Sequence, residues 1–479
     1  MRRKKNTISK LFLYRHRFVI GYTVLGLLFV GFLFGLPLIA QTGLSQAEID
    51  SAVNSYALNY DAPMNGDLVD LPYRLLQKIS ILVFGLTPYA IKLPSILIGL
   101  TLGFLFTLLL NRWFRNNVSL LASSLIVLST PFLFLAGSGT PLIMIVFWPT
   151  LLLWLGSKIQ GEKKPKPMYS FLFAVTLLLA IFTPFMPYFA VFCVIFVLMQ
   201  PHLRFVVRSL PRLPFFVMGA IIVGGVAVLI MNMVNHPNTI MELLFAEGFQ
   251  PSMIWDNLGR GFAPVFSWWH EVDSVFLAPL LSLPMLALVL IGLFSTTKGF
   301  FASRNSIASI LLVFTVVITA FNPDAALFFI LPVAILVAHG LKYILERWYG
   351  LFPENPYARV AAIFPLSVLF GVILIPSSIQ YIYGYHYSPE VAKHFNFDLA
   401  IIAKNLTNET LVTNDNYDFY KILERTTDIK VVHGAGEAEA SVTLAMLHQK
   451  NDSPTYQLSQ IITSPLRENS DIIYLYTVK

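Results

Sequence analysis

The carboxylates of the segment 43–50 are the residues of this chain best suited, by type and spacing, to do chemistry. Glu48 and Asp50 lie between one long apolar run and the next. A carboxylate in such a place could take a proton from an acceptor hydroxyl. Positions two residues apart on a helix point about 160° apart, so the two acids are not expected to serve one site together. Either Asp50 or Glu48 is therefore the candidate catalytic base, and we favour one acid over a pair.

A structural role is open for both acids. Ser45-Gln-Ala-Glu48 fits the S-x-x-E capping box, which predicts a helix start and a glutamate folded back on that start. Asp50 would then be a first-turn acid that favours the helix dipole. Ile49, Val53 and Tyr56 follow on one helical face, which makes the helix amphipathic. The position of the acids between two spans is what favours a function.

The composition is that of a polytopic membrane protein. Of 479 residues, 56% are apolar and 12% are charged, against roughly 25% charged in a soluble domain. The net charge of +7 does not indicate nucleic-acid binding, because the cations are sorted by loop. Cys193 is the one cysteine, so the chain has no intramolecular disulfide.

The apolar runs predict eleven membrane-spanning helices. The first run, 18–40, is too long for a signal-peptide core and is expected to remain as a helix. The other ten predicted spans cover 89–110, 118–136, 140–155, 169–183, 185–199, 213–234, 275–294, 307–321, 325–344 and 361–382.

The distribution of cations predicts the orientation. Lys and Arg crowd the segments on one side, starting with residues 1–17, whereas the other side has very few. The positive-inside rule then places the N-terminus inside and the loops 41–88 and 235–274 outside. Eleven crossings leave the C-terminus outside as well. We expect an all-α polytopic membrane bundle over 1–383, in the plasma membrane.

Residues 384–479 form a different kind of sequence. Charge rises, long apolar runs end, and short strands are predicted at 410–413, 429–432 and 471–478. Helices are predicted at 415–425 and 437–447. The region is expected to be a small extracytoplasmic α/β domain.

The segment after the acids resembles a known family. Leu71-Pro-Tyr-Arg continues to Phe84-Gly85, and Ile91-Lys92-Leu-Pro94-Ser95 continues to Gly99. With Ser129-Thr-Pro131-Phe132, these motifs resemble the GT-C glycosyltransferases of the protein O-mannosyltransferase and aminoarabinose-transferase type, over about residues 40–160. Three positions depart from the family pattern: Ala47 replaces an aspartate, Lys92 replaces an arginine, and 137–141 has no acid.

The resemblance implies transfer of a sugar from a polyprenyl-phosphate-linked donor to an acceptor hydroxyl at the outer face. The acceptor would be a glycan, a lipid or a protein. Cations would hold the lipid phosphate, and the few on the outer side are Arg74, Lys78, Lys92 and Arg260. For Lys92 the alternative is snorkelling to the membrane interface. Arg74 and Lys78 lie one turn apart and could instead touch anionic membrane lipid.

The second outer loop holds the candidates for a metal or acceptor site. His236, His270 and Asp273 combine imidazole and carboxylate, which suits a divalent cation. The spacing of these residues specifies no particular ion, so the cofactor stays unassigned.

Two other functions remain open. A transporter or flippase of a lipid-linked solute would also be a large apolar bundle, although transporters tend to carry ionisable groups near the membrane midplane. A non-catalytic membrane receptor or assembly factor with the GT-C fold is the third possibility, and the missing aspartates keep it open. Vesicle uptake without sugar transfer would indicate the transporter, and donor binding without turnover the non-catalytic protein.

Overall fold

The structure is a computed structural model of the whole chain. It describes residues 16–40, 43–58, 68–161, 167–208, 212–244, 250–266, 281–298, 303–352, 354, 357, 361–387, 394–406, 409–434, 443–450, 455–463 and 472–478.

Apolar helices make up most of the described chain. Six of them are long and apolar enough to cross a membrane, or eight if each of two bent helix pairs counts as one span. The six are α2 (Arg17–Ala40), α5 (Pro88–Trp113), α8 (Met144–Gly161) with η3 (Pro141–Ile143), α12 (Arg212–Asn235), α17 (Ile330–Leu351) with η5 (Pro323–Phe329), and α19 (Ile363–Tyr387).

The two bent pairs and three shorter apolar helices complete the bundle. α6 (Asn116–Val127) meets α7 (Thr130–Gly137) at 64°, and α10 (Met186–Met199) meets α11 (Pro201–Arg208) at 100°. The shorter helices are α9 (Pro167–Ile181), α15 (Leu283–Thr297) and α16 (Ser303–Thr319). Each of the eleven predicted apolar segments therefore contains a helix. The number of crossings and the direction of insertion remain predictions.

Two features hold the bundle together. An aromatic cluster of Phe189, Phe192, Phe314 and Phe328 joins α10, α16 and η5, with ring centroids 4.7–6.2 Å apart. Glycines allow α15 and α17 to touch along their backbones. A Cβ at Gly292 would overlap the Leu336 carbonyl, and one at Gly340 would overlap the Leu288 carbonyl. Close contact between small residues is a usual way for membrane helices to pack.

At the end of the bundle that carries the first predicted outer loop, several short elements cover the helices. β1 (Leu44–Ser45) leads into α3 (Gln46–Tyr56), and α4 (Leu71–Phe84) follows. The second predicted outer loop contributes α13 (Asn238–Leu244), η4 (Pro251–Met253) and α14 (Ile254–Phe266). On α4, the exposed Leu76, Ile79 and Val83 form an apolar face, typical of a helix lying in a membrane surface.

The C-terminal region contains a five-stranded sheet and short helices. Its elements are β2 (Phe395–Asn396), α21 (Asp398–Asn405), β3 (Thr410–Thr413), α22 (Tyr417–Lys421), η6 (Ile422–Arg425), β4 (Val431–His433), β5 (Leu444–Leu447), β6 (Tyr456–Thr463) and β7 (Ile472–Val478). The sheet order is β4-β3-β5-β7-β6, with β3 parallel to β4 and β5, and β7 antiparallel to β5 and β6.

One predicted helix of this domain is wrong. Residues 444–447, the end of the predicted helix 437–447, form the strand β5 between β3 and β7; residues 435–442 lie outside the described part. All four residues of β5 are buried. A strand buried on both faces has a continuous apolar run, which periodicity alone does not separate from a helix. β6 was not predicted; it is a largely exposed edge strand.

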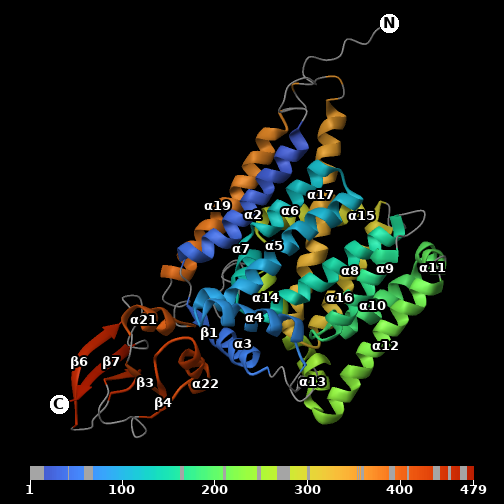
Figure 1. Cartoon of the computed structure of the whole chain (residues 1–479). Coiled ribbons are helices and arrows are strands. Elements are labelled where there is room, and N and C mark those ends of the chain that lie inside the picture. Colours follow the sequence, from blue (N-terminus) through green and yellow to red (C-terminus); the bar gives the residue numbers. More distant parts are fainter. Residues whose placement is uncertain are drawn as a thin grey trace.

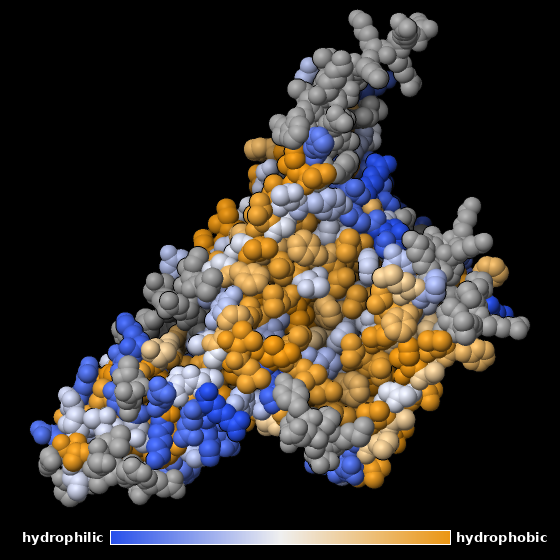
Figure 2. All heavy atoms as spheres, viewed as in Figure 1, coloured by the Kyte–Doolittle hydropathy of each residue, from blue (hydrophilic) through white to orange (hydrophobic). Residues whose placement is uncertain are grey.

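The arrangement in space places the C-terminal domain beside α3 and β1, at one end of the bundle (Figure 1). α2 and α19 run side by side from this end towards the other. Hydrophobic residues cover the visible face of the bundle, and hydrophilic ones gather on the C-terminal domain (Figure 2). This pattern fits helices surrounded by lipid with a domain outside the hydrocarbon.

The α15–α17 crossing gives a first prediction. Gly340→Ala should destabilise the protein by about 1–3 kcal/mol, because the added methyl group would push the two backbones apart. The measurement is the thermal midpoint of the purified protein in detergent. Gly350→Ala is the matched control, since a Cβ there meets open space. Equal midpoints for the two variants would contradict the close packing.

Candidate functional site

The first turn of α3 fixes Glu48 in a capping box. The Ser45 hydroxyl accepts a hydrogen bond from the Glu48 amide at 3.3 Å, and Glu48 Oε2 accepts one from the Ser45 amide at 2.8 Å. This arrangement confirms the sequence-based prediction of the helix start. It also directs the Glu48 side chain inward, where only 2% of it is exposed.

A second backbone amide reaches Glu48 from the turn after α7. Gly139 N–H donates to Glu48 Oε1 at 2.6 Å. Gly139 lies close to α5, because a Cβ at this position would be 2.8 Å from Ile91 Cγ2 and 3.2 Å from the Ile91 carbonyl. A larger residue would therefore move the amide away from the carboxylate.

Lys92 supplies the positive charge. Its Nζ lies 3.5 Å from Glu48 Oε1 and donates to the Gly43 carbonyl at 2.8 Å. The lysine side chain is 5% exposed, so this is a buried ion pair. Removing one partner of such a pair leaves an uncompensated charge, which is strongly destabilising.

Gln77 ties the elements around this ion pair together. Its Nε2 donates to the Ile91 carbonyl at 3.1 Å and the Gly139 carbonyl at 2.8 Å. Its Oε1 accepts from Ser51 at 2.9 Å and Ser55 at 2.6 Å. The fully buried side chain thus joins α3, α4, α5 and the turn after α7.

Tyr73, one turn before Gln77 on α4, extends this polar cluster. Its hydroxyl lies 2.7 Å from Ser95 Oγ, which donates to the Thr140 carbonyl at 3.2 Å. Burial raises the pKa of the Tyr73 hydroxyl, so it stays neutral and hydrogen-bonded. We name Glu48, Lys92, Gln77, Tyr73 and Gly139 the buried polar cluster.

The C-terminal domain holds the same segment from the other side. β1 pairs antiparallel with β2, with Leu44 opposite Asn396 and Ser45 opposite Phe395. The chains are so close that a Cβ at Gly43 would lie 2.7 Å from the Asn396 carbonyl oxygen. The capping serine therefore belongs both to α3 and to a two-strand contact with the C-terminal domain.

A buried carboxylate fixes β2 within that domain. Asp398, fully buried, accepts hydrogen bonds from Asn396 Nδ2 at 2.8 Å and the Tyr420 hydroxyl at 2.9 Å. His448 Nε2 lies 3.1 Å from the same carboxylate. The position of β1 thus depends on an ordered polar core in the C-terminal domain.

Asp50 lies in a different environment from Glu48. It is exposed, and its Oδ1 accepts a hydrogen bond from Gln46 Nε2 at 2.9 Å. The same Gln46 Nε2 donates to Asn416 Oδ1 at 3.1 Å, just before α22. Asp50 therefore lies beside the seam between α3 and the segment 416–425, defined here as the α3 seam. The opposite placement of the two acids agrees with the expected angle between them.

Two cations meet at the far end of the α3 seam. Lys78 Nζ lies 5.7 Å from the centre of the Tyr56 ring, and the Arg425 guanidinium lies 5.6 Å from it. Lys78 also donates to the Leu58 carbonyl. Burial and the nearby Arg425 guanidinium lower the pKa of Lys78. The cation–π contacts orient both side chains at the junction of α3, α4 and η6.

The other predicted site residues lie away from Glu48 and Asp50 or outside the described residues. Arg74 lies on α4, one turn before Lys78. Arg260 is exposed on α14 and pairs with Asp256, on a helix that packs against η5 and α16. His236 lies between α12 and α13, whereas His270 and Asp273 lie outside the described residues. Within the described ranges, no three His, Cys, Asp or Glu side chains are grouped to hold a metal ion.

Sequence reasoning missed Gln77, Gly139 and Arg425. Gln77 is a buried amide in an apolar helix, which is a signal in itself because such groups need partners. Gly139 contributes only its backbone, and no residue pattern marks that contribution. Arg425 lies in the C-terminal domain, 369 positions after Tyr56, so only the fold brings it to the seam.

Comparison with solved structures shows that the fold resembles those of two kinds of protein, ArnT and an archaeal oligosaccharyltransferase. ArnT from Cupriavidus metallidurans bound to undecaprenyl phosphate matches with a TM-score of 0.56 at 12% identity, covering 96% of this chain and 98% of ArnT. The Archaeoglobus fulgidus oligosaccharyltransferase tethered with an acceptor peptide matches with a TM-score of 0.53 at 11% identity. That match covers 90% of this chain but 65% of the oligosaccharyltransferase. No family model and no curated protein sequence matches the chain.

The buried ion pair gives the second prediction. Lys92→Met should cost about 3 kcal/mol, because Glu48 would remain buried without its cation. Adding Glu48→Gln to Lys92→Met should restore part of this loss, since the double variant buries no charge. Thermal midpoints in detergent measure both effects. Lys342→Met is the control, because the pair of Lys342 with the exposed Glu346 is a surface contact worth little. Additive losses in the double variant would show that the two groups are not coupled.

Proposed function

We propose that this protein is a membrane glycosyltransferase that moves a sugar from a polyprenyl-phosphate-linked donor to an acceptor hydroxyl at the α3 end of the bundle. One observation carries the proposal: the acid-bearing segment 43–56 lies between a GT-C bundle and a C-terminal domain. The fold match to ArnT extends over nearly the whole of both chains. ArnT was solved with undecaprenyl phosphate, and the oligosaccharyltransferase with an inhibitory peptide and a dolichol-phosphate. Undecaprenyl phosphate and dolichol-phosphate are both polyprenyl phosphates, the class of lipid carrier that the proposal requires.

In this proposal Asp50 is the base and Glu48 is structural. Both oxygens of Glu48 accept backbone amides, and Lys92 compensates its charge. Asp50 is exposed beside the α3 seam, with one intrahelical contact from Gln46. It is therefore free to accept a proton from an acceptor hydroxyl, whose oxygen then attacks the sugar carbon as the bond to the lipid phosphate breaks.

Lys78 and Arg425 are the proposed lipid-phosphate ligands. Arginine and lysine stabilise the negative charge that develops on a leaving phosphate. Asp50 and Tyr56 are separated by six residues of α3, or about 9 Å along the helix axis. That separation leaves room for a sugar ring between the base and the cations. The apolar face of α4 sets Lys78 at headgroup level, because it orients the helix along the membrane surface.

An apolar groove along this same apolar face of α4 could take part of an isoprenoid chain. Its volume is about 350 Å³, and it lies between α4 and α5 with Phe147 of α8 at its edge. Leu76, Ile79 and Val83 line it from α4, and Leu97 from α5. A flexible polyprenyl tail would gain the burial of apolar surface there.

The second candidate function is donor binding without transfer. Ala47 stands where the resembling family has an aspartate, and Glu48 is held in the buried polar cluster. If Asp50 does not act as a base, the same site would bind a lipid-linked sugar without turnover.

Asp50→Asn should lower sugar transfer at least about a hundredfold, because general-base catalysis contributes on this scale. The assay follows radioactive sugar from a polyprenyl-phosphate donor to product in reconstituted membranes, and donor binding is measured alongside. Asp428→Asn, an exposed acid of the C-terminal domain outside the segment 416–425, is the matched control and should retain activity. Wild-type transfer by Asp50→Asn would remove the base assignment. Donor binding with no transfer by the wild-type protein would establish the second candidate.

Arg425→Gln should weaken the affinity for undecaprenyl phosphate about tenfold, through loss of a charge-assisted hydrogen bond. Equilibrium binding to the detergent-solubilised protein measures the effect. Lys404→Gln removes an exposed cation of the same domain on α21 and should leave affinity unchanged. If the two variants bind alike, the lipid phosphate lies elsewhere.

A further inference from the structure

A second cavity lies at the end of the bundle opposite the Glu48 site. It has a volume of about 980 Å³ and opens between the turn that joins α5 to α6, the end of α17 and the start of α19. Lys92 and Arg112 lie near opposite ends of α5, twenty residues apart, which corresponds to about 30 Å of helix. This length matches the hydrocarbon thickness of a bilayer. The cavity thus lies at the level of the other membrane surface.

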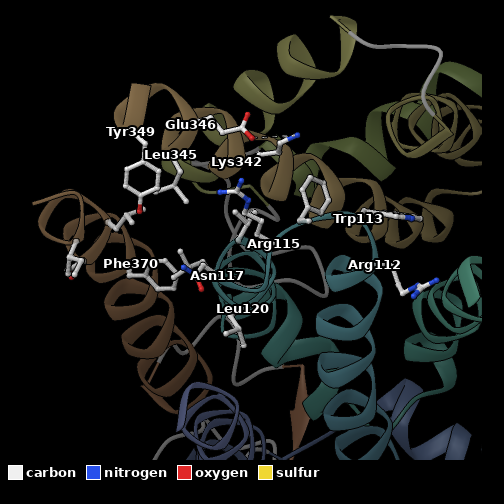
Figure 3. A pocket seen from close by; sticks show the side chains of 16 residues that line it. Arg112, Trp113, Arg115, Asn117, Leu120, Lys342, Leu345, Glu346, Tyr349 and Phe370 are labelled. Atoms are coloured by element: carbon white, nitrogen blue, oxygen red, sulfur yellow. Dashed lines mark ion pairs between the residues drawn. The ribbon is translucent and has the colours of Figure 1, made fainter. Parts of the chain in front are cut away.

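Cations dominate the polar part of the cavity. Arg112, Arg115 and Lys342 line it, against the single carboxylate of Glu346. Lys342 lies 3.9 Å from Glu346, and Arg112 donates to the Ser157 carbonyl at 3.1 Å. In the described part of the chain no ion pair holds Arg115. Figure 3 shows its side chain extending between α17 and α19, with Arg112 and Trp113 at the edge. Its charge is therefore available to an anion.

The rest of the lining is apolar and leads towards the lipid-facing side of the helices. Leu345 on α17, Leu120 on α6 and Leu366 and Phe370 on α19 form the walls. Ile363, at the start of α19, is 62% exposed. The cavity therefore combines a cationic head with apolar walls on helices that face lipid. A small soluble anion would leave those walls in contact with water, whereas acyl chains would cover them.

We propose that this cavity binds an anionic phospholipid, with the headgroup phosphate on Arg115 and Lys342 and the acyl chains against α6 and α19. Basic pockets between membrane helices bind such headgroups. The first turn of α6 adds to the positive electrostatic potential of the cavity. Its N-cap residue, Arg115, makes no side-chain cap, so no capping side chain pairs the first backbone N–H groups of the helix. Trp113 and Tyr349 at the same level suit the headgroup zone. The site is independent of the proposed transfer reaction.

The test is a titration of the full-length protein, in neutral detergent, with phosphatidylglycerol that carries a fluorophore on one acyl chain. We expect Arg115→Gln to bind about tenfold more weakly than the wild type. Lys342→Gln should weaken binding at least as much, because it leaves Glu346 facing the phosphate without its partner. Arg347→Gln is the matched control and should bind as the wild type, since Arg347 is an exposed arginine of α17 that stacks on Tyr343 outside the cavity lining.

Three further outcomes decide the identity of the ligand. A phosphatidylcholine carrying the same fluorophore should bind more weakly than phosphatidylglycerol, and millimolar inorganic phosphate should not displace the bound lipid. Equal binding of both lipids would overturn the headgroup assignment. Displacement by inorganic phosphate would show a free-anion site in place of a phospholipid site. Wild-type affinity in both Arg115→Gln and Lys342→Gln, at unchanged thermal midpoints, would overturn the proposal as a whole.

Discussion

The buried Glu48 carboxylate is the constraint on which this end of the molecule depends. A charge removed from water must be compensated by hydrogen bonds and an opposite charge, or it destabilises the fold by several kcal/mol. The compensation comes from three separate parts of the chain: the Ser45 amide, the Gly139 amide and Lys92. Satisfying one carboxylate therefore fixes β1, the start of α3, the turn after α7 and the first turn of α5 relative to one another.

This constraint gives Glu48 a structural role. Residues 137–141 contain no acid, but the turn supplies a backbone amide that points at Glu48. An acid in that turn would have repelled the carboxylate, whereas an amide attracts it. The departure from the family pattern at this turn and the burial of Glu48 are thus mutually consistent. In the proposed function, proton transfer falls to an acid outside the buried polar cluster, and Asp50 is exposed beside the α3 seam.

The sequence predicts the features that depend on local pattern. The apolar helices, the capping box at Ser45 and three of the C-terminal strands follow from composition and periodicity within a few residues. The buried polar cluster does not, because its contacts join positions far apart: Gly139 meets Glu48 across 91 positions. Arg425 reaches Tyr56 only after the C-terminal domain packs on α3. The prediction of a helix at β5 is wrong because its residues form a continuous apolar run, which fits a buried helix as well as a buried strand. Pairing with β3 on one side and β7 on the other makes this run a strand, and these partners are distant in sequence.

The two ends of α5 show why cations at a membrane surface do not all have the same role. Lys92 at one end is buried and its charge is already matched by Glu48, so it stabilises the fold and has little left for a ligand. At the other end Arg115, just after the helix, remains exposed beside apolar walls. Lys78 and Arg425 lie between these extremes, since an aromatic ring orients them without neutralising them. The degree of internal compensation, more than the residue type, therefore distinguishes Lys92 from the cations that we propose as ligands of a lipid phosphate.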